Sequence, residues 1–560
     1  MTPPLRFAVV SLSCILTTFS SVAQQAATST PSFRSQTNLV LIPVQVRSHG
    51  QHVSKLKQES FTLLQDGKPQ KIAVFEEVRT STQRLQRVPV GPREFTNQLL
   101  GTPETARYTV IAIDRITTAT LDLVRVREGL SRFLTHSADT GEPVRLISIE
   151  DRGIRLLQDF TTDPKAIAMA LQRSTKGAGQ TEQSSVTLDE SLQEVETAVI
   201  SDNASGDKVT QYLKGLDSAK DSEQRMLAFQ ERTTRINSLE ALQQIALSLS
   251  GLPGRKSLVW ASSGYPFSST TRQGRTAVTF DISQVSEATS LDAYTTQLLN
   301  NANIAMYPVD ARGIKNTAWD AMDPTHKYSP TNAEKDGRQL ANQDVITTFE
   351  RLAAGTGGKP CYNRAELSDC FKEALEDSRD YYMVGFYVDS KGTKDGWHKL
   401  QVKVDEKGTN IRSRNGFLYP LPDPEKTREQ DMNTAVRSLL LDSGIPFKGE
   451  WTTTQKKGDK TSNAFTIEVS PAANVIDPAQ RRLNLEFAGV ARAKDGTIVG
   501  QFAQKVQREL PPEAVATIQT SGITYKNAID LPSGDYLVRI VVRDNNTGRT
   551  GAANSLLKVQ

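Results

Sequence analysis

Serine-dependent hydrolysis is the first chemistry to consider in this 560-residue chain. Ser262 and Ser263 lie in the stretch Ala261-Ser262-Ser263-Gly264, which is not the Gly-x-Ser-x-Gly turn that exposes a nucleophile in many hydrolases. None of the five histidines belongs to a His-Glu-x-x-His motif, and the two that are close in sequence, His49 and His52, lie in a polar loop. A hydrolase would need a His, an Asp and a Ser that converge only in the fold, so this hypothesis ranks last among those we compare.

Cysteine chemistry is limited to one pair, because Cys14 falls within an N-terminal leader described below. Cys361 and Cys370 close a short loop, and no histidine or further cysteine lies nearby in sequence to complete a zinc site. We therefore predict a disulfide in an oxidising compartment, with two free buried thiols as the alternative.

Two acidic residues end apolar runs. Asp114 ends Tyr108–Asp114, whose near-continuous apolar character indicates a strand covered on both faces. Asp310 ends a second run and precedes Arg312 by two residues. Ligands bind at the carboxyl ends of strands in open α/β sheets, so Asp310 and Arg312 are candidates for the rim of a site. The alternatives are a local ion pair between them and, for Asp114, a helix N-cap or an ion pair with Arg115.

A basic pair precedes one of the buried strands. Gly251 and Pro253 end the preceding helical pattern, and Arg255 and Lys256 follow before the chain becomes apolar. We expect this pair to face solvent.

Strands and helices alternate between residues 107 and 390. Apolar runs predict strands at 108–114, 144–149, 257–261 and 304–309, and helical patterns cover 121–135, 239–249 and 291–301. This alternation is typical of a doubly wound α/β sheet, which we assign to residues 105–390. The charged, Gln- and Ser-rich residues 182–238 are predicted to be a helical insertion in it.

The other segments divide by composition. Residues 1–23 have a basic start, a short apolar core and a small-residue ending, as in a cleaved signal peptide; a membrane anchor is the alternative. Alternating patterns predict a small β unit at 35–80, a β extension at 391–420 and a C-terminal β-sandwich at 446–560, the last after a linker with a short helix at 421–445. The mature protein is expected to be exported, periplasmic or secreted, with no later transmembrane segment.

The charge of the chain is nearly balanced. Lys and Arg number 67 against 63 Asp and Glu, a net charge of +4, and no run of five or six basic residues occurs. This distribution argues against a nucleic-acid partner.

Five motifs in order resemble the bacterial von Willebrand factor A-related proteins of the acidobacterial type. They are DGKPQKI (66–72), FTTD (160–163), LPGRKSLVW (252–260), YPVDARG (307–313) and YYMVGFY (381–387). The resemblance covers roughly residues 35–420. It implies a von Willebrand A-like, Rossmann-like α/β fold that binds protein partners through Mg²⁺ or another divalent cation at the carboxyl ends of the strands. Without the resemblance, the residues do not identify a cofactor.

The family's cation loops are only partly matched. Where the family has Asp-x-Ser-x-Ser, this chain has Asp114-Arg115-Ile116-Thr117-Thr118, so the resemblance implies Asp114 and Thr118 as ligands and leaves an isoleucine at the middle hydroxyl position. Thr181 corresponds to the threonine of the second loop, with Thr161 or Thr162 as alternatives. These residues would hold a cation through oxygen ligands.

The second carboxylate of the family's site is missing. Ser262-Ser263-Gly264 stands where the family has Thr-Asp-Gly, so Ser262 and Ser263 can offer only hydroxyl or water-mediated contacts. The site is therefore expected to be degenerate.

These observations favour an exported, non-enzymatic protein that recognises a protein partner or cell-surface material. Recognition would use the carboxyl-end face of the von Willebrand A-like domain. The alternative is a metal-independent structural or assembly component of the cell envelope, and an envelope-polymer hydrolase is the weaker third hypothesis.

Overall fold

The computed structural model divides the chain into a unit from Met1 to Asn38 and a unit from Leu39 to Gln560, and every element below belongs to the second. The predicted signal peptide at 1–23 lies outside the described residues, as does most of the predicted insertion at 182–238. Among the helices that are described, none is long and apolar enough to cross a membrane. The structure describes residues 39–79, 86–88, 90–100, 107–136, 142–151, 153–174, 226, 229, 232–264, 282–314, 332–377, 379–389, 392–420, 423–477 and 481–560.

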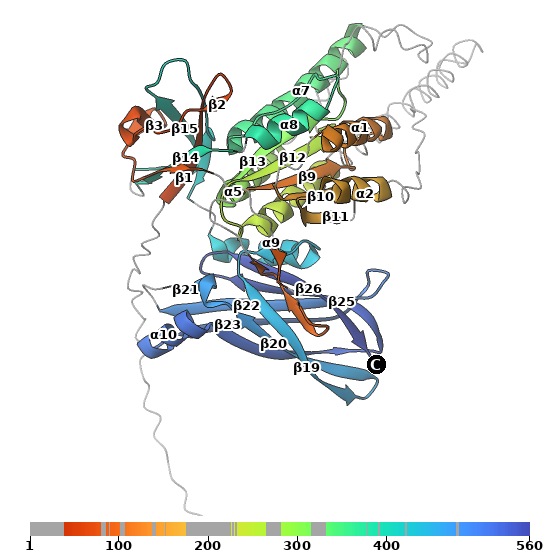
Figure 1. The fold of residues 1–560 in the computed structure, drawn as a ribbon. Coiled ribbons are helices and arrows are strands. Elements are labelled where there is room, and N and C mark those ends of the chain that lie inside the picture. Colours follow the sequence, from red (N-terminus) through yellow and green to blue (C-terminus); the bar gives the residue numbers. More distant parts are fainter. Residues whose placement is uncertain are drawn as a thin grey trace, which may run out of the picture. The chain divides into compact units, whose positions relative to one another are not determined.

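A five-stranded mixed sheet lies at the centre of the α/β region (Figure 1). Its strands are β9 (Tyr108–Asp114), β10 (Val144–Glu150), β11 (Gly153–Thr161), β12 (Lys256–Ser262) and β13 (Ile304–Asp310). The order is β11-β10-β9-β12-β13, with β11 antiparallel to β10 and the other pairs parallel. The four predicted strands and the α/β class are confirmed.

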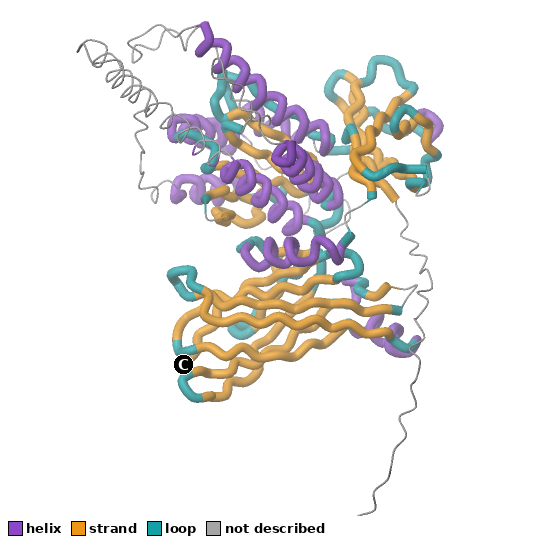
Figure 2. Tube along the Cα trace, turned by 180° about the vertical axis from the view of Figure 1, so that it is seen from behind, coloured by secondary structure: helices purple, strands orange, loops and turns teal. Residues whose placement is uncertain are grey.

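Helices cover both faces of this sheet (Figures 1 and 2). Alternate residues of each buried strand point to opposite faces, so Ile111 and Val259 pack on one side while Val110 and Trp260 pack on the other. The first side is covered by α1 (Thr120–His136), α2 (Pro164–Ser174) and α8 (Ser368–Asp377). The second is covered by the helix over residues 232–249, α5 (Ile282–Asn301) and α7 (Asn332–Thr356).

Two distant segments of the chain form one antiparallel β region. The first contributes β1 (Leu39–Ser48), β2 (Gln51–His52), β3 (Phe61–Gln65), β4 (Lys68–Gln70) and β5 (Val74–Val78). The second contributes β14 (Tyr381–Tyr387), β15 (Gly396–Val404), β16 (Asn410–Arg412) and β17 (Gly416–Tyr419). They form the sheets β16-β1-β14-β5 and β17-β15-β3-β4, which share one apolar core that includes Ile42, Leu63 and Phe386.

The strand β14 differs from the sequence-based expectation. Its residues were assigned to the α/β domain at 105–390, but β14 pairs in antiparallel with β1 and β5. Alternate side chains of β14 explain this pairing, because Tyr382, Val384 and Phe386 all face the core shared with the first segment. The predicted units at 35–80 and 391–420 therefore meet through a strand expected elsewhere.

The C-terminal region consists of antiparallel sheets. One has the order β24-β20-β19-β7, from β7 (Glu94–Thr96), β19 (Phe447–Lys457), β20 (Lys460–Val469) and β24 (Ile523–Leu531). The other contains β18 (Asp442–Ser443), β21 (Ile476–Asp477), β22 (Arg482–Arg492), β23 (Ile498–Glu509), β25 (Gly534–Asp544) and β26 (Thr550–Val559). Buried residues of both sheets, such as Phe465 and Val538, form one core. The helix α10 (Pro512–Ser521) lies between β23 and β24 in sequence.

The segment around β7 lies between the predicted units at 35–80 and 105–390, and it packs on the C-terminal region. Phe95 of β7 is buried in the C-terminal core, and Asn97 donates hydrogen bonds to the carbonyls of Asp442 and Ile445 at 2.6 and 2.8 Å. The chain thus contributes an edge strand to the C-terminal sheet before it enters the α/β region.

Candidate functional site

Three strand ends meet at the carboxyl edge of the mixed sheet. In the parallel register Ala261 is opposite Ile113, and Ser262 is opposite Asp310. Asp114, Ser262 and Asp310 therefore lie at the ends of the neighbouring strands β9, β12 and β13. The chain order along the sheet reverses between β9 and β12, which is where open α/β sheets form ligand sites.

The carboxylate of Asp114 accepts hydrogen bonds from its own loop and from β12. Oδ1 accepts the backbone N–H groups of Ile116 (3.0 Å) and Thr117 (3.3 Å). Oδ2 accepts the hydroxyls of Thr117 (2.9 Å) and Ser262 (3.1 Å). Burial raises the pKa of Asp114, and the hydrogen bonds from Thr117, Ile116 and Ser262 oppose that rise. Asp114 is neither a cap of α1, which begins at Thr120, nor an ion-pair partner of Arg115.

Thr117 is the functional residue that the sequence analysis missed. The family pattern directed attention to Thr118 and to the isoleucine at 116, but Thr117 supplies the hydroxyl beside Asp114. Its Oγ1 also lies 2.7 Å from the Oγ of Ser262. The available signal was a hydroxyl three residues after a strand-end aspartate, a spacing at which a Thr side chain can hydrogen-bond back to the loop.

Thr118 and Ser263 form a second link between the same loops. Thr118 Oγ1 accepts the backbone N–H of Ser263 at 3.1 Å. The hydroxyl of Ser263 donates to Asp122 Oδ2 on α1 at 3.2 Å. Both predicted residues are thus at the site, although their polar atoms point to protein partners.

Arg125 connects α1 to the loop after β13 by hydrogen bonds. Its Nη1 donates to Asp122 Oδ1 at 2.7 Å and to the carbonyl oxygens of Ala311 and Arg312 at 3.2 and 2.8 Å. The loop after β13 is therefore held against the first turns of α1.

Asp310 and Arg312 form a local ion pair. Arg312 Nε and Nη2 donate to the two carboxylate oxygens of Asp310 at 2.8 and 2.7 Å, and the Arg312 N–H adds a bond of 3.0 Å. Arg115, by contrast, has its Nη1 3.8 Å from Glu150 Oε1. Both oxygens of the buried Asp310 carboxylate are thus paired with Arg312.

The second-loop threonine has one candidate outside the described residues and two that the fold separates from Asp114. Thr181 is not among the residues that the structure describes. Because β11 runs antiparallel to β10, Thr161 is opposite Val144, at the start of β10 and so at the other edge of the sheet. Thr162 follows it there, so neither residue reaches the site of Asp114.

The residues described at this edge do not fit a divalent cation. Mg²⁺ needs several free hard oxygen lone pairs in near-octahedral array. The Asp114 carboxylate already accepts four hydrogen bonds, the Ser262 hydroxyl accepts the Gly264 N–H, and Asp310 is paired with Arg312. In the described part of the chain, no group of three or more His, Cys, Asp or Glu side chains is placed to hold a metal ion.

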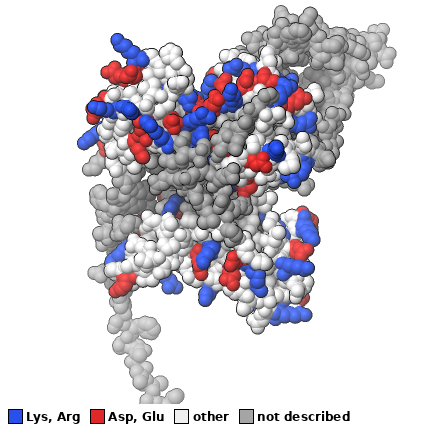
Figure 3. All heavy atoms as spheres, viewed as in Figure 1, with Lys and Arg blue, Asp and Glu red and all other residues white. Residues whose placement is uncertain are grey.

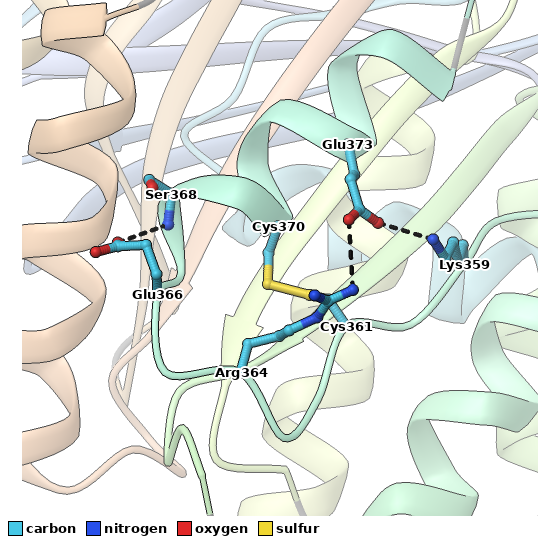
Figure 4. Close-up of a disulfide and its surroundings, with 7 residues drawn as sticks. All are labelled: Lys359, Cys361, Arg364, Glu366, Ser368, Cys370 and Glu373. Atoms are coloured by element: carbon cyan, nitrogen blue, oxygen red, sulfur yellow. Dashed lines mark hydrogen bonds and ion pairs between the residues drawn. A yellow bond between two sulfur atoms is a disulfide. The ribbon is translucent and has the colours of Figure 1, made fainter. Parts of the chain in front are cut away.

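The predicted disulfide between Cys361 and Cys370 is present (Figure 4). Cys361 forms a parallel bridge to Val309, donates its N–H to the Pro308 carbonyl and accepts the Asp310 N–H, both at 2.8 Å. Cys370 belongs to α8. The bond therefore fastens the outer edge of the sheet, directly beside Asp310, to a helix.

The expectation that Arg255 and Lys256 face solvent is wrong, because both side chains are buried. Arg255 Nη2 donates to the Gly357 carbonyl at 2.8 Å, and its guanidinium carbon lies 5.8 Å from the ring centre of Tyr381. Lys256 Nζ donates to the Ala302 carbonyl at 2.7 Å. The long side chains reach backbone acceptors and an aromatic ring that a local reading of the turn cannot reveal.

Two aliphatic side chains are exposed at the carboxyl edge. Leu121, which precedes Asp122 on α1, is 80% exposed, and Ile314, which follows the loop held by Arg125, is 58% exposed. A Cβ built on Gly313 would lie 3.2 Å from Arg125 Cδ, and Leu121 precedes Arg125 by four residues on α1, so both aliphatic positions are close to Arg125 in the chain or in space. On the face drawn in Figure 3, the described basic and acidic side chains are interspersed.

Comparison with known proteins gives no family. No family model and no curated protein matches the chain. Solved structures with local likeness include a glycosyl hydrolase family 2 member from Bacteroides cellulosilyticus (10% identity, 35% of this chain, 21% of that chain, TM-score 0.16) and dimeric latent PorU from Porphyromonas gingivalis (14% identity, 32% and 14%, TM-score 0.13). The matched parts span 21% or less of those chains. Likeness this weak carries no weight for fold or function.

Proposed function

We propose that the protein is an exported, non-enzymatic module that binds another protein through the carboxyl edge of a von Willebrand A-like domain. The observation that carries the proposal is the pair of exposed aliphatic side chains, Leu121 and Ile314, at the edge where Arg125 holds the loop after β13 against α1. Exposed apolar side chains that a partner covers together, within a polar surround, form the usual centre of a protein-binding surface.

The sheet order supports the von Willebrand A-like assignment. In chain order the five strands read 3-2-1-4-5, with the third antiparallel, and Cys361 adds a single parallel bridge beyond the fifth. Three of the quoted motifs, at 160–163, 252–260 and 307–313, fall on this framework, whereas those at 66–72 and 381–387 lie in the antiparallel β region. The two antiparallel sheets with a common core support the β-sandwich assigned to the C-terminal region. Export rests on the leader sequence, with the disulfide as additional support.

A structural or assembly role is the second candidate, and a specific observation favours it. The Asp114 carboxylate has all its hydrogen bonds within the protein, as a purely structural residue would. A hydrolase remains the weaker proposal, since neither Ser262 nor Ser263 hydrogen-bonds to a histidine within the described residues.

The proposal is tested by charge substitution at the exposed edge. Envelope proteins that bind the purified protein are identified by mass spectrometry, and their affinities are then measured with each purified partner. We expect Leu121→Asp and Ile314→Asp to weaken binding by about tenfold or more, because a charge replaces an apolar contact. Leu556→Asp on β26 is the matched control, since Leu556 is 81% exposed. Equal binding by all three variants would transfer support to the structural role.

A further inference from the structure

The loops after β9 and β12 are joined by a closed set of hydrogen bonds. Ser262 Oγ donates to Asp114, accepts the Gly264 N–H at 2.8 Å and lies 2.7 Å from Thr117 Oγ1. Thr117 Oγ1 in turn donates to Asp114 at 2.9 Å. Each polar atom that faces Asp114 therefore already has a partner in the protein.

A cation at this position would have to break that set. Thr117 and Ser262 have one hydroxyl proton each, which they share between Asp114 and their 2.7 Å contact with each other. A cation ligated by these hydroxyls would have to displace those contacts. Among the described residues, the Asp114 carboxylate would be the only charge left to face the ion, because Asp310 is neutralised by Arg312 and Asp122 by Arg125. A divalent ion would then lose its water shell for too little negative charge.

We propose that Asp114, Thr117 and Ser262 form a metal-independent brace that fixes the loops after β9 and β12 in place. Its hydrogen bonds join side chains at the ends of the neighbouring strands β9 and β12, where the strand order reverses, as a cation bound between these strand ends would. It positions the carboxyl edge whatever that edge binds, so it does not depend on the proposed function.

The brace makes a distinctive prediction for substitutions at Asp114. In Asp114→Asn the amide oxygen still accepts the N–H groups of Ile116 and Thr117, and the amide NH₂ donates to the two hydroxyls, which can accept as well as donate. Asp114→Ala leaves the part-buried N–H groups of Ile116 and Thr117 without their acceptor, and the hydroxyls of Thr117 and Ser262 keep only each other and the Gly264 N–H. A cation site responds in the opposite way, because a neutral amide is a much poorer ligand than a carboxylate.

The experiment measures thermal midpoints of the purified wild-type protein, Asp114→Asn, Asp114→Ala and Thr117→Val, in EDTA and then in millimolar Mg²⁺, Mn²⁺ or Ca²⁺. We expect no cation-dependent shift, a midpoint for Asp114→Asn within about 2 °C of the wild type, and a fall of several degrees for Asp114→Ala. Thr117→Val removes one hydroxyl and gives an intermediate fall, which keeps the test decisive if Asp114→Ala does not fold. Asp151→Asn, at an exposed carboxylate just beyond β10, is the control.

Three outcomes overturn the brace. The first is a cation-dependent rise of several degrees in the wild type that Asp114→Asn abolishes, which would restore a metal site. The second is an Asp114→Asn variant as unstable as Asp114→Ala, and the third is an Asp114→Ala variant as stable as the wild type. None of these outcomes bears on the partner-binding test, which uses different residues.

Discussion

Lys256 is an ionisable side chain buried at the start of a central strand. Its ammonium group has one hydrogen bond, to the Ala302 carbonyl, and burial lowers its pKa to about 7. The unfolded chain keeps the lysine proton up to about pH 10.5, whereas the folded protein loses it near pH 7. Between these values the unfolded state binds more protons, so Lys256 makes stability rise with pH.

This residue gives the pH prediction. From pH 7 to pH 9 the Lys256 contribution to the free energy of unfolding increases by about 2 kcal/mol. In Lys256→Met that increase is absent, so the variant gains less from the pH change than the wild type by this amount. Urea unfolding at both pH values measures the difference. The exposed Lys403→Met serves as control and retains the wild-type pH dependence; an unchanged slope in Lys256→Met would show that the amine is not dehydrated in the folded protein.

At the residue scale, the sequence predicted which residues lie at the site better than it predicted their hydrogen-bond partners. Asp114 and Ser262 were predicted at strand ends, and both lie at the site because parallel strands of equal length end at one edge. Thr117 was missed because adjacent hydroxyls in a loop differ only in direction, which depends on the local backbone. The burial of Arg255 also depends on a distant carbonyl, that of Gly357, so no local pattern contains it.

The edge segment next to β13 is an element held by covalent and ionic contacts. Cys361 is bonded to Cys370 on α8, and Glu373 of the same helix meets Lys359 and Arg364 at 2.7 and 3.5 Å (Figure 4). The ion pairs are largely exposed and contribute little individually. The disulfide is therefore the main restraint on this edge.

Replacement of both cysteines tests that restraint. The two residues are nine apart in sequence, so loss of the cross-link in Cys361→Ala/Cys370→Ala is expected to lower the free energy of unfolding by roughly 2–3 kcal/mol. Hydrogen exchange measures the local effect: the Cys361 and Asp310 amides, which bond across this edge, should exchange faster, while those of the central strand β9 keep their protection relative to global unfolding. Reduction of the wild type should reproduce the change. Unaltered exchange at Asp310 would mean that the backbone bonds hold the edge without the disulfide.

At the element scale, the strands buried on both faces could be predicted from the sequence, and the half-exposed edge strand could not. The strands β9, β10, β12 and β13 are nearly continuous apolar runs, because a strand covered on both faces needs such a composition. The strand β11 was not predicted, since an edge strand is half exposed and its apolar pattern is weak. Pairing between distant segments was also not predictable: the alternation in β14 indicates a strand but does not specify β1 and β5 as its neighbours.

At the scale of the molecule, one helix links the α/β region to the C-terminal sheets. In α9 (Pro424–Arg437), Asp431 accepts the hydroxyl of Tyr294 from α5 at 2.8 Å and the Nη2 of Arg543 from β25 at 2.7 Å. Burial and then the charge of Asp431 raise the pKa of Tyr294. Leu440, just after α9, packs in the apolar core of the α/β region. The segment predicted as a linker with a short helix at 421–445 thus forms a joint that contacts both regions through buried side chains, among them Asp431 and Leu440.

The joint predicts coupled unfolding of the two regions. Asp431→Ala leaves the fully buried Arg543 without its counter-charge and should lower the free energy of unfolding by about 3 kcal/mol or more. Tyr294→Phe removes only the bond to α5, so it should weaken coupling at a smaller cost in stability. Trp260 reports on the α/β core and Trp451 on the C-terminal core, and their fluorescence can be separated with Trp→Phe variants.

In the wild type the two reporters should change at one denaturant concentration, because unfolding either core exposes the joint. In Asp431→Ala the Trp451 transition is expected to move to lower denaturant than the Trp260 transition, since the unpaired Arg543 belongs to the C-terminal sheet. Asp459→Ala, in an exposed turn, should leave the transitions together. Coincident transitions in Asp431→Ala would mean that packing of residues such as Leu440, and not the Asp431 contacts, couples the two cores; a double variant with Leu440→Ala would then be needed to separate them.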